Sequence, residues 1–458
     1  MLEEGMLSTE QWVRIKAAEE QRLAQQSEAI ELSGSPRWYE RLRMYGFAEV
    51  RFNRLGQPNG DLINWQDASV GKHLGDNDQF DAAEPAGFFF RRIRLVLAGQ
   101  VSDRVSMYLQ PDFSSHTSGK LGGVTLRDAW GQYAFDSKKE WRLRVGQQRV
   151  PCSFDSWQSS RQRVAIDRAD ATASCMPNNR DVAVSFQYTP QIAKFRWKQM
   201  VDYLNGAGDY GMINLTVFNG QGANERERNA NKHFALRLAY PFELWGGRLL
   251  EVGLNAMRGK YSVNPGKPSN TSIKLFSLTS DKTFERRNFE DKRVNAYVYY
   301  PPQPFGLLAE YVRGVGPIRN ADGIIEEKSF SGGYVQLQYK WKYSDMGTVD
   351  FYSRWQTYNG GLKFATGAPN VKSRELEFGV AWMPDPQWEL TIAYAFTKRV
   401  NFEKTKKLAT FTNAIPCDST FNIPDGVTQP TTNAFCEPGQ QATVTANLIR
   451  IQLQWYFN

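Results

Sequence analysis

No stretch of this 458-residue sequence approaches the ~18 consecutive apolar residues that a membrane-spanning helix requires. The mean hydropathy is strongly polar, at -0.54, and the chain has only 3 His and 4 Cys. It also lacks a glycine-rich phosphate loop, a CxxC pair and the ligand spacing of a zinc site. These absences exclude a helical membrane protein and leave little material for metal-dependent or nucleophilic catalysis.

The few candidate catalytic and metal-binding residues are weak ones. The histidines are scattered along the chain: His73, His116 and His233. A hydrolase needs a nucleophile held against a base, and only His116 has candidate nucleophiles beside it, at Ser114 and Ser115. An acidic group could hold Ca²⁺, although a solvated loop is favoured: Asp78, Asp81 and Glu84. We therefore expect no enzyme activity and no cofactor.

Aromatic residues and glycine, by contrast, are plentiful. The chain has 13 Trp, 20 Tyr, 28 Phe and 37 Gly. Many aromatics with little net apolarity are typical of outer-membrane barrels, whose strands alternate apolar and polar side chains. A period of two begins at Trp38 and predicts sixteen strands, near residues 38–53, 88–101, 104–113, 124–135, 141–150, 180–189, 210–218, 233–241, 248–258, 293–300, 307–314, 331–342, 347–357, 373–383, 388–398 and 446–457.

Individual strands show this alternation clearly. Near residue 141, Trp141, Leu143 and Val145 share one face, while Arg142 and Arg144 share the other. This pattern is typical of a strand with one face in an apolar medium and the other in water. It predicts a closed antiparallel transmembrane barrel over residues 37–458.

The connectors between the predicted strands alternate between short turns and long loops. The long ones are residues 54–87, 151–179, 259–292 and 399–445. Short turns on one side and long loops on the other are typical of a barrel threaded through a membrane. Residues 190–209 break the rule, since they are long where a short turn is expected; they contain Phe195, Trp197 and Met200, and we interpret them as an insertion that could dock a partner.

The amino-terminal residues 1–36 form a separate predicted segment. Residues 8–31 favour a helix, because Ser8 and Gln11 make a capping box and a thin apolar stripe follows. A solvated leader and a periplasmic helix that packs on a partner are both open. The first ten residues show neither a basic region nor an apolar region of a signal peptide, so we expect that such a peptide has been removed.

Charge and cysteine content narrow the environment. The net charge of +8 would suit a nucleic-acid binder, but no motif of that class accompanies it, and an anion-attracting channel explains the charge equally well. Four cysteines permit three pairings: Cys152, Cys175, Cys417 and Cys436. The local pairing, 152 with 175 and 417 with 436, is favoured over free thiols, and each bond would stabilise the fold by roughly 3 kcal/mol. Disulfides would indicate an oxidising compartment.

The sequence as a whole resembles the phosphate-selective porin O/P family of the bacterial outer membrane. The resemblance is carried by RRIRLVLAGQVSDRVSMYLQPDF (91–113), LRDAWGQYAF (126–135), LRVGQQRVPCSFDS (143–156), NNRDVAVSFQY (178–188), FNGQGANERERNANKHFALRLAYPF (218–242), LEFGVAWMPDPQWELTIAY (376–394) and the closing LIRIQLQWYF. It implies a sixteen-stranded trimer in which residues 151–179 fold inward as a constriction loop. It also implies passive diffusion of small hydrophilic solutes, preferentially anions such as phosphate.

Basic residues would line such a channel. By strand face or by position on the loop, the candidates are Arg92, Arg94, Arg142, Arg144, Arg149, Arg161, Arg163, Arg168 and Arg180. Guanidinium groups suit this role because they match phosphate and carboxylate geometry. The alternative is that these arginines pair with acids and stiffen the wall, with Asp128, Asp155, Asp167, Asp170 and Asp181 as partners. On the eighth to eleventh strands the basic residues are sparser: Arg237, Arg258, Arg293 and Arg313.

The expected partners follow from this interpretation. We expect a homotrimer in contact with outer-membrane lipid and lipopolysaccharide, with small anions as solutes and no nucleic acid. A rival hypothesis is a structural barrel that anchors a larger complex through residues 1–36 and 190–209. A periplasmic partner for residues 1–36 belongs to that hypothesis.

Overall fold

The structure is a computed structural model, and it describes residues 37–55, 86–114, 123–176, 179–263, 288–319, 325–343, 346–364, 368–401 and 442–457. Several predictions concern residues outside these ranges. They are the helical leader 1–36, the acidic group at residues 78–84, His73, His116, and the pairing of Cys417 with Cys436.

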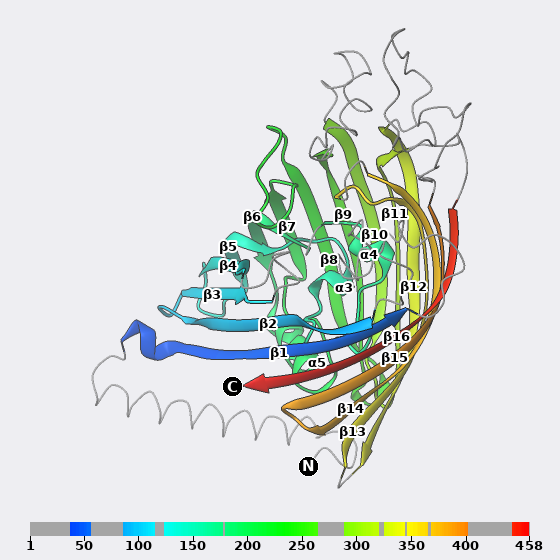
Figure 1. Cartoon of the computed structure of the whole chain (residues 1–458). Coiled ribbons are helices and arrows are strands. Elements are labelled where there is room, and N and C mark those ends of the chain that lie inside the picture. Colours follow the sequence, from blue (N-terminus) through cyan, green and yellow to red (C-terminus); the bar gives the residue numbers. More distant parts are fainter. Residues whose placement is uncertain are drawn as a thin grey trace, which may run out of the picture.

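Sixteen antiparallel strands form one closed barrel, in which each strand pairs with its neighbours in the sequence and β1 pairs with β16. This confirms the predicted fold (Figure 1). The strands are β1 Leu42–Leu55, β2 Ala86–Gln100, β3 Val105–Asp112, β4 Thr125–Ala134, β5 Trp141–Arg149, β6 Arg180–Tyr188, β7 Ile213–Phe218, β8 His233–Glu243, β9 Leu249–Ser262, β10 Asn288–Tyr300, β11 Phe305–Arg319, β12 Ile325–Tyr343, β13 Gly347–Gly361, β14 Asn370–Asp385, β15 Trp388–Asn401 and β16 Ala442–Phe457.

The alternation in the sequence decides which side chains face the interior. In β5, Trp141 and Val145 are exposed on the outer wall, whereas Arg142 and Arg144 are buried inside. The same division holds in β15, where Ile392 is exposed and Thr391 is buried. Because the side-chain period of a strand is two, each strand gives the barrel an apolar outer wall and a polar inner wall.

Exposed aromatic rings gather on the outer wall near the short turns. They are Trp38, Tyr39, Phe135, Trp141, Phe242, Trp245, Phe305, Trp341, Tyr343, Trp382, Trp388 and Phe457. Rings with an apolar body and a polar edge are typical of the membrane–water boundary. Two short 3-10 helices lie at the same edge, η1 Trp38–Arg41 before β1 and η5 Trp245–Gly247 between β8 and β9.

The later strands are longer than the sequence indicated. The prediction began β10 at residue 293 and β12 at residue 331, but they begin at Asn288 and Ile325. The added ends carry charged outward side chains such as Glu290 and Glu327. Strand pairing continues there beyond the apolar band, so the periodic hydrophobic signal ends before the hydrogen-bonded ladder does.

The segment between β5 and β6, which the structure describes over residues 150–176 and at Asn179, folds into the barrel and is called the inward loop below. It contains two short helices, α3 Phe154–Trp157 and α4 Asp170–Ala173, which Figure 1 shows inside the curve of the wall. A disulfide joins Cys152 to Cys175 near the two ends of the loop. The predicted inward folding and this local disulfide are both confirmed.

The predicted insertion at residues 190–209 contains the helix α5, Gln191–Tyr203. Ala193, Trp197 and Met200 form its buried face. That face packs inside the barrel, against the inward loop and the inner wall of β8 to β12. Trp197 and Met200 therefore cannot contribute to an external docking surface, and the anchoring role of this segment stays a prediction. None of the helices in the described ranges combines the length and the apolarity needed to cross a bilayer.

Candidate functional site

Asp167 ties the inward loop to the far side of the barrel. Its carboxylate accepts a hydrogen bond of 2.8 Å from Arg51 in β1 and lies 3.6 Å from Arg450 in β16. Arg91 in β2 lies 3.8 Å away. Burial alone would raise the pKa of Asp167, but the three arginines outweigh burial and hold its pKa well below the ordinary range. Asp167 therefore stays ionised and anchors the loop at neutral pH.

Further contacts fix the rest of the inward loop. Asp170 pairs with Arg399 in β15 at 2.8 Å and accepts a hydrogen bond from Ser373 in β14. Glu310 in β11 accepts a hydrogen bond of 2.6 Å from the backbone N–H of Phe154. These contacts reach strands on the side opposite the loop's origin, so the loop crosses the interior.

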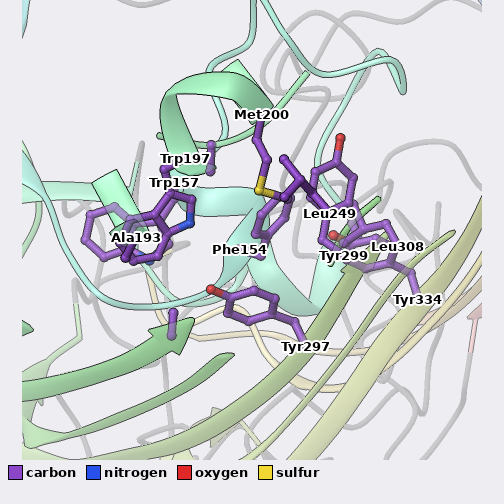
Figure 2. Close-up of a cluster of buried hydrophobic side chains, with 13 residues drawn as sticks. Phe154, Trp157, Ala193, Trp197, Met200, Leu249, Tyr297, Tyr299, Leu308 and Tyr334 are labelled. Atoms are coloured by element: carbon purple, nitrogen blue, oxygen red, sulfur yellow. The ribbon is translucent and has the colours of Figure 1, made fainter. Parts of the chain in front are cut away.

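An apolar cluster joins the inward loop to α5. Figure 2 shows Trp157 beside Trp197, with Phe154 lying between Met200 and the tyrosines of β10. The Nε1 of Trp197 donates to Glu251 at 3.0 Å, so the buried indole is fully satisfied. The interior is therefore narrowed both by the inward loop and by the helix at the short-turn end.

Several of the predicted channel arginines are paired with acids. The pairs are Arg92 with Glu49, Arg94 with Asp112, Arg142 with Asp209, Arg163 with Asp155 and Arg180 with Asp128. In the last four pairs the distance between the charged atoms ranges from 2.7 Å for Arg142 to 3.8 Å for Arg163. Of the acids that the sequence offered as partners, Asp155 and Asp128 pair with these arginines. Asp167 and Asp170 pair with other arginines, and Asp181 accepts hydrogen bonds from the backbone N–H groups of Gly220 and Gly222.

Four of the predicted arginines have no carboxylate within 4.0 Å among the described residues: Arg144, Arg149, Arg161 and Arg168. Arg144 donates to Gln132, Arg149 donates to the backbone carbonyl of Trp157, and Arg168 donates to that of Asp155 at 2.9 Å. The guanidinium of Arg161 has no hydrogen bond to any described residue. We call Arg144, Arg149 and Arg161 the unpaired arginines.

The unpaired arginines lie against aromatic rings on the inner side of the barrel. The guanidinium carbon of Arg144 is 4.0 Å from the ring centre of Trp130, and that of Arg161 is 4.4 Å from the ring centre of Tyr456. Arg149 lies 5.7 Å from the ring centre of Tyr210. Stacking engages the face of a guanidinium and leaves N–H donors at its edge. The donors of Arg161 are therefore free to bind an anion.

The interior is more open beside β3 and β4 than beneath the inward loop. Tyr108 and Trp130 are half-buried inner-wall residues, whose rings stack with centres 5.3 Å apart. Arg149 and Arg161 are also half-buried. The inner-wall residues Arg399 and Arg450, by contrast, are 1% exposed. Arg149 and Arg161 are therefore more accessible than the arginines beneath the inward loop, whereas Arg144 is buried.

Sequence reasoning missed several buried arginines of the inner wall: Arg51, Arg354, Arg399 and Arg450. The period of two could have identified them as inward residues. Arg450, for example, lies between the outward residues Ile449 and Ile451. Of the sparse later set, Arg237 and Arg293 are buried inside and Arg258 and Arg313 are exposed on the outer wall.

The remaining chemistry of the interior is structural. His233 is fully buried, stacks on Phe218 and lies 3.5 Å from Asp291. Within the described ranges, no group of three or more His, Cys, Asp or Glu is placed to hold a metal ion. Burial lowers the pKa of Arg163 to about 10, which leaves this loop residue charged at neutral pH.

Comparison with known proteins identifies the barrel's relatives. A family model described as "Phosphate-selective porin O and P" matches residues 71–416, which is most of the chain. A search among curated proteins finds no match.

Among solved structures, the chain is similar to the high-pH structure of OprB from Pseudomonas putida, with 8% identity and a TM-score of 0.51 over 91% of this chain and 94% of that one. It is also similar to an anion-selective porin from Comamonas acidovorans, at 10% identity and a TM-score of 0.46, over 91% and 99%. A third is OmpT from Vibrio cholerae in its trimer form, at 11% identity and a TM-score of 0.48, over 91% and 98%. The likeness to OprB is a likeness of fold.

Proposed function

Because this chain belongs to the phosphate-selective porin O and P family, and so forms a channel in the bacterial outer membrane, we propose that it passes small hydrophilic solutes by passive diffusion, preferentially anions such as phosphate. The observation that carries the proposal is the set of unpaired arginines, of which Arg149 and Arg161 are half-buried on the more open side of the interior and Arg144 is buried. Their charge is not cancelled by a neighbouring carboxylate in the described part of the chain.

The physical argument concerns desolvation. An anion that enters a narrow, low-dielectric passage loses part of its hydration shell, so fixed positive charge and hydrogen-bond donors must replace it. Arg161 lies on the inward loop and Arg149 lies at the end of β5, and both side chains are half-buried, so their guanidinium groups can offer such donors. Conduction also requires release, and donors spread over several residues allow an anion to pass from one to the next.

The paired arginines have a different role in this proposal. Arg92 and Arg94 hold Glu49 and Asp112, and they line the wall without offering uncancelled charge. The pairs that anchor the inward loop, such as Asp167 with Arg51, keep the passage at a fixed width. Selectivity is thus assigned to the unpaired arginines, and rigidity to the ion-paired network.

A substitution at Arg161 tests the proposal. An anion 4 Å from a unit positive charge gains about 1 kcal/mol even at the dielectric constant of water, which corresponds to about fivefold in relative permeability. Arg161→Gln should therefore lower the anion-to-cation permeability ratio by about fivefold in planar bilayers. Arg374→Gln is the matched control, because it removes the same charge from the exposed outer wall of β14.

The outcomes separate the proposal from its rival. An unchanged ratio in Arg161→Gln, or an equal loss in Arg374→Gln, would overturn the assignment of selectivity to the unpaired arginines. A wild-type protein that inserts but carries no current would favour the hypothesis of a plugged barrel that anchors a larger complex.

We further propose that the protein is a homotrimer. The wall is low on one side, where β3, β4 and β5 have 8, 10 and 9 residues, and high on the other, where β12 has 19. A tilted strand needs about 9–11 residues to cross the hydrocarbon layer, so the low side suits contact with neighbouring subunits. A single-barrel mass in mild detergent would contradict the trimer.

A further inference from the structure

A group of basic side chains interrupts the apolar outer wall. Arg258 in β9 and Lys292 in β10 are direct neighbours across the ladder, and Phe234 in β8 is the next residue in the same row. One row nearer the short turns, Arg313 in β11 faces Val294 in β10. The side chains of Arg258 and Lys292 are 73% and 46% exposed, and Arg313 is exposed as well.

The charge of this group is not balanced by the acids around it. Glu290 contacts Lys292 and lies 4.0 Å from Arg258, while Lys260 adds a further positive charge beside it. Arg313 has no carboxylate within 4.0 Å in the part of the chain that the structure covers. The outer wall therefore carries a net positive charge at this place.

The energetics of a lipid-facing wall fix the level of the group. An arginine or lysine on that wall is strongly destabilising at the bilayer midplane but costs little near the boundary with water. The rows toward the short turns are apolar, with Leu254 and Tyr311 among them. Arg258, Lys292 and Arg313 therefore lie at the headgroup level on the side of the long loops, which faces the cell exterior in outer-membrane barrels.

An apolar groove begins at this basic group. It has a volume of about 910 Å³ and runs across the outer faces of β6 to β11. Beside the three basic residues it is lined by apolar side chains, among them Val184, Phe186, Leu215, Val217 and Phe234. We call it the outer-wall groove. Its basic side chains lie at the headgroup level, and its apolar side chains form the rest of the surface. This combination suits an amphiphile whose polar end carries phosphate.

We propose that the outer-wall groove binds lipopolysaccharide of the outer leaflet. A phosphate of its lipid A is held by Arg258, Lys292 and Arg313, and an acyl chain lies along the apolar side chains of β6 to β8. Arginine and lysine are suited to this headgroup because each forms charge-assisted hydrogen bonds to phosphate oxygens. The proposal uses the outer-membrane location but not the anion preference of the channel, so either can fail without the other.

Binding of purified lipid A to the detergent-solubilised protein, followed by native mass spectrometry, tests the proposal. The test variant is Arg258→Gln with Lys292→Gln and Arg313→Gln. The control variant is Arg374→Gln with Lys398→Gln, which removes two exposed basic residues that face each other across β14 and β15. Heat-dependent mobility on gels verifies that each variant is folded.

We expect the test variant to bind bisphosphorylated lipid A at least about tenfold more weakly than the wild type, because it lacks the three side chains that form charge-assisted hydrogen bonds to phosphate. The control variant should bind like the wild type, and lipid A without phosphate should bind equally weakly to all three. The anion permeability of the test variant should be unchanged.

Three results would overturn the proposal. They are wild-type affinity in the test variant, an equal loss in the control variant, and equally tight binding of phosphate-free lipid A. The last of these would reduce the outer-wall groove to an ordinary lipid-facing surface.

Discussion

Asp167→Asn is the substitution that most sharply tests how the inward loop is held. The amide keeps the shape of the carboxylate but removes its charge, which faces Arg51 at 2.8 Å, Arg450 at 3.6 Å and Arg91 at 3.8 Å. Each carboxylate oxygen lies within a buried site, since Asp167 is 1% exposed. The loop should therefore open more often, while the barrel itself stays intact.

The size of the expected loss in free energy depends on which other partners Arg51 and Arg450 keep in the variant. Breaking a buried ion pair costs about 3–5 kcal/mol when the remaining charge has no other partner. Arg51 keeps hydrogen bonds to Gln452, and Arg450 keeps Glu377 at 2.5 Å. We therefore expect a smaller loss, about 2 kcal/mol, which corresponds to a roughly 30-fold increase in the open population of the loop.

Hydrogen exchange in detergent measures this population. Amides of residues 160–175 should exchange about 30-fold faster in the variant, whereas amides of β12 and β13 should not change. Asp103→Asn is the control, because Asp103 pairs with Arg41 at 3.4 Å on the surface, with 97% of its side chain exposed. A pair of this kind contributes about 0–1 kcal/mol, so the loop should exchange as in the wild type.

The pH dependence of hydrogen exchange in the inward loop is a second test of the role of Asp167. The pKa of Asp167 is lowered in the folded protein, so its contribution is fully present above the ordinary pKa of about 4 and is lost only as the pH falls through the lower folded value. Wild-type protection of the loop should thus persist at pH 4 after correction for intrinsic exchange. Unchanged exchange in Asp167→Asn at neutral pH, or equal acceleration in every strand, would refute the reasoning.

Other predictions concern α5 and the disulfide. Trp197→Ala should lower stability by about 3 kcal/mol because it empties a fully buried site, and thermal unfolding should show no comparable loss for Trp245→Ala, whose side chain is 78% exposed. Replacing Cys152 and Cys175 by Ser should cost about 3 kcal/mol and speed proteolysis of the inward loop; an unchanged cleavage rate would contradict this. The pKa of Asp209 is lowered, because the guanidinium of Arg142 outweighs the effect of burial. The amides of α5 should therefore stay protected from hydrogen exchange as the pH falls through about 4. In Asp209→Asn they should lose this protection at neutral pH.

Most of the barrel could be predicted because its environment imposes one rule on every strand. The outward apolar and inward polar side chains of β5, such as Val145 and Arg144, follow from lipid outside and water inside. The prediction weakened where that rule ends. Beyond the apolar band, Glu290 and Glu327 face water on the outside as well, and a strand with two polar faces has no periodic signal.

The candidate site could be predicted only in part. Strand face correctly placed Arg92 and Arg144 on the inner wall, but it could not show that Glu49 cancels one charge while Trp130 stacks on the other. Glu49 lies directly opposite Arg92 in the β1–β2 ladder, and Trp130 lies on β4 beside β5. Both contacts depend on the register between neighbouring strands, which the alternation of side chains does not specify. The functional role of the predicted arginines stays a prediction.

The path of the inward loop was the feature that the sequence predicted least well. Its length and its two cysteines indicated a tethered loop, but the loop is held by Asp167 and Asp170 against arginines that lie far along the chain, at Arg399 and Arg450. Nothing in the local sequence specifies such long-range ion pairs. The same holds for Trp197 and Met200 of α5, which pack inside the barrel against residues of β8 to β12. The docking role of residues 190–209 stays a prediction.

The most direct test of the account is the zero-current potential of the wild-type channel in a planar bilayer under a gradient of potassium phosphate. The account predicts a potential with the sign of anion flow, together with a conductance that saturates as phosphate rises. A potential with the sign of potassium flow, or a conductance that rises linearly without saturation, would contradict an anion path along the unpaired arginines.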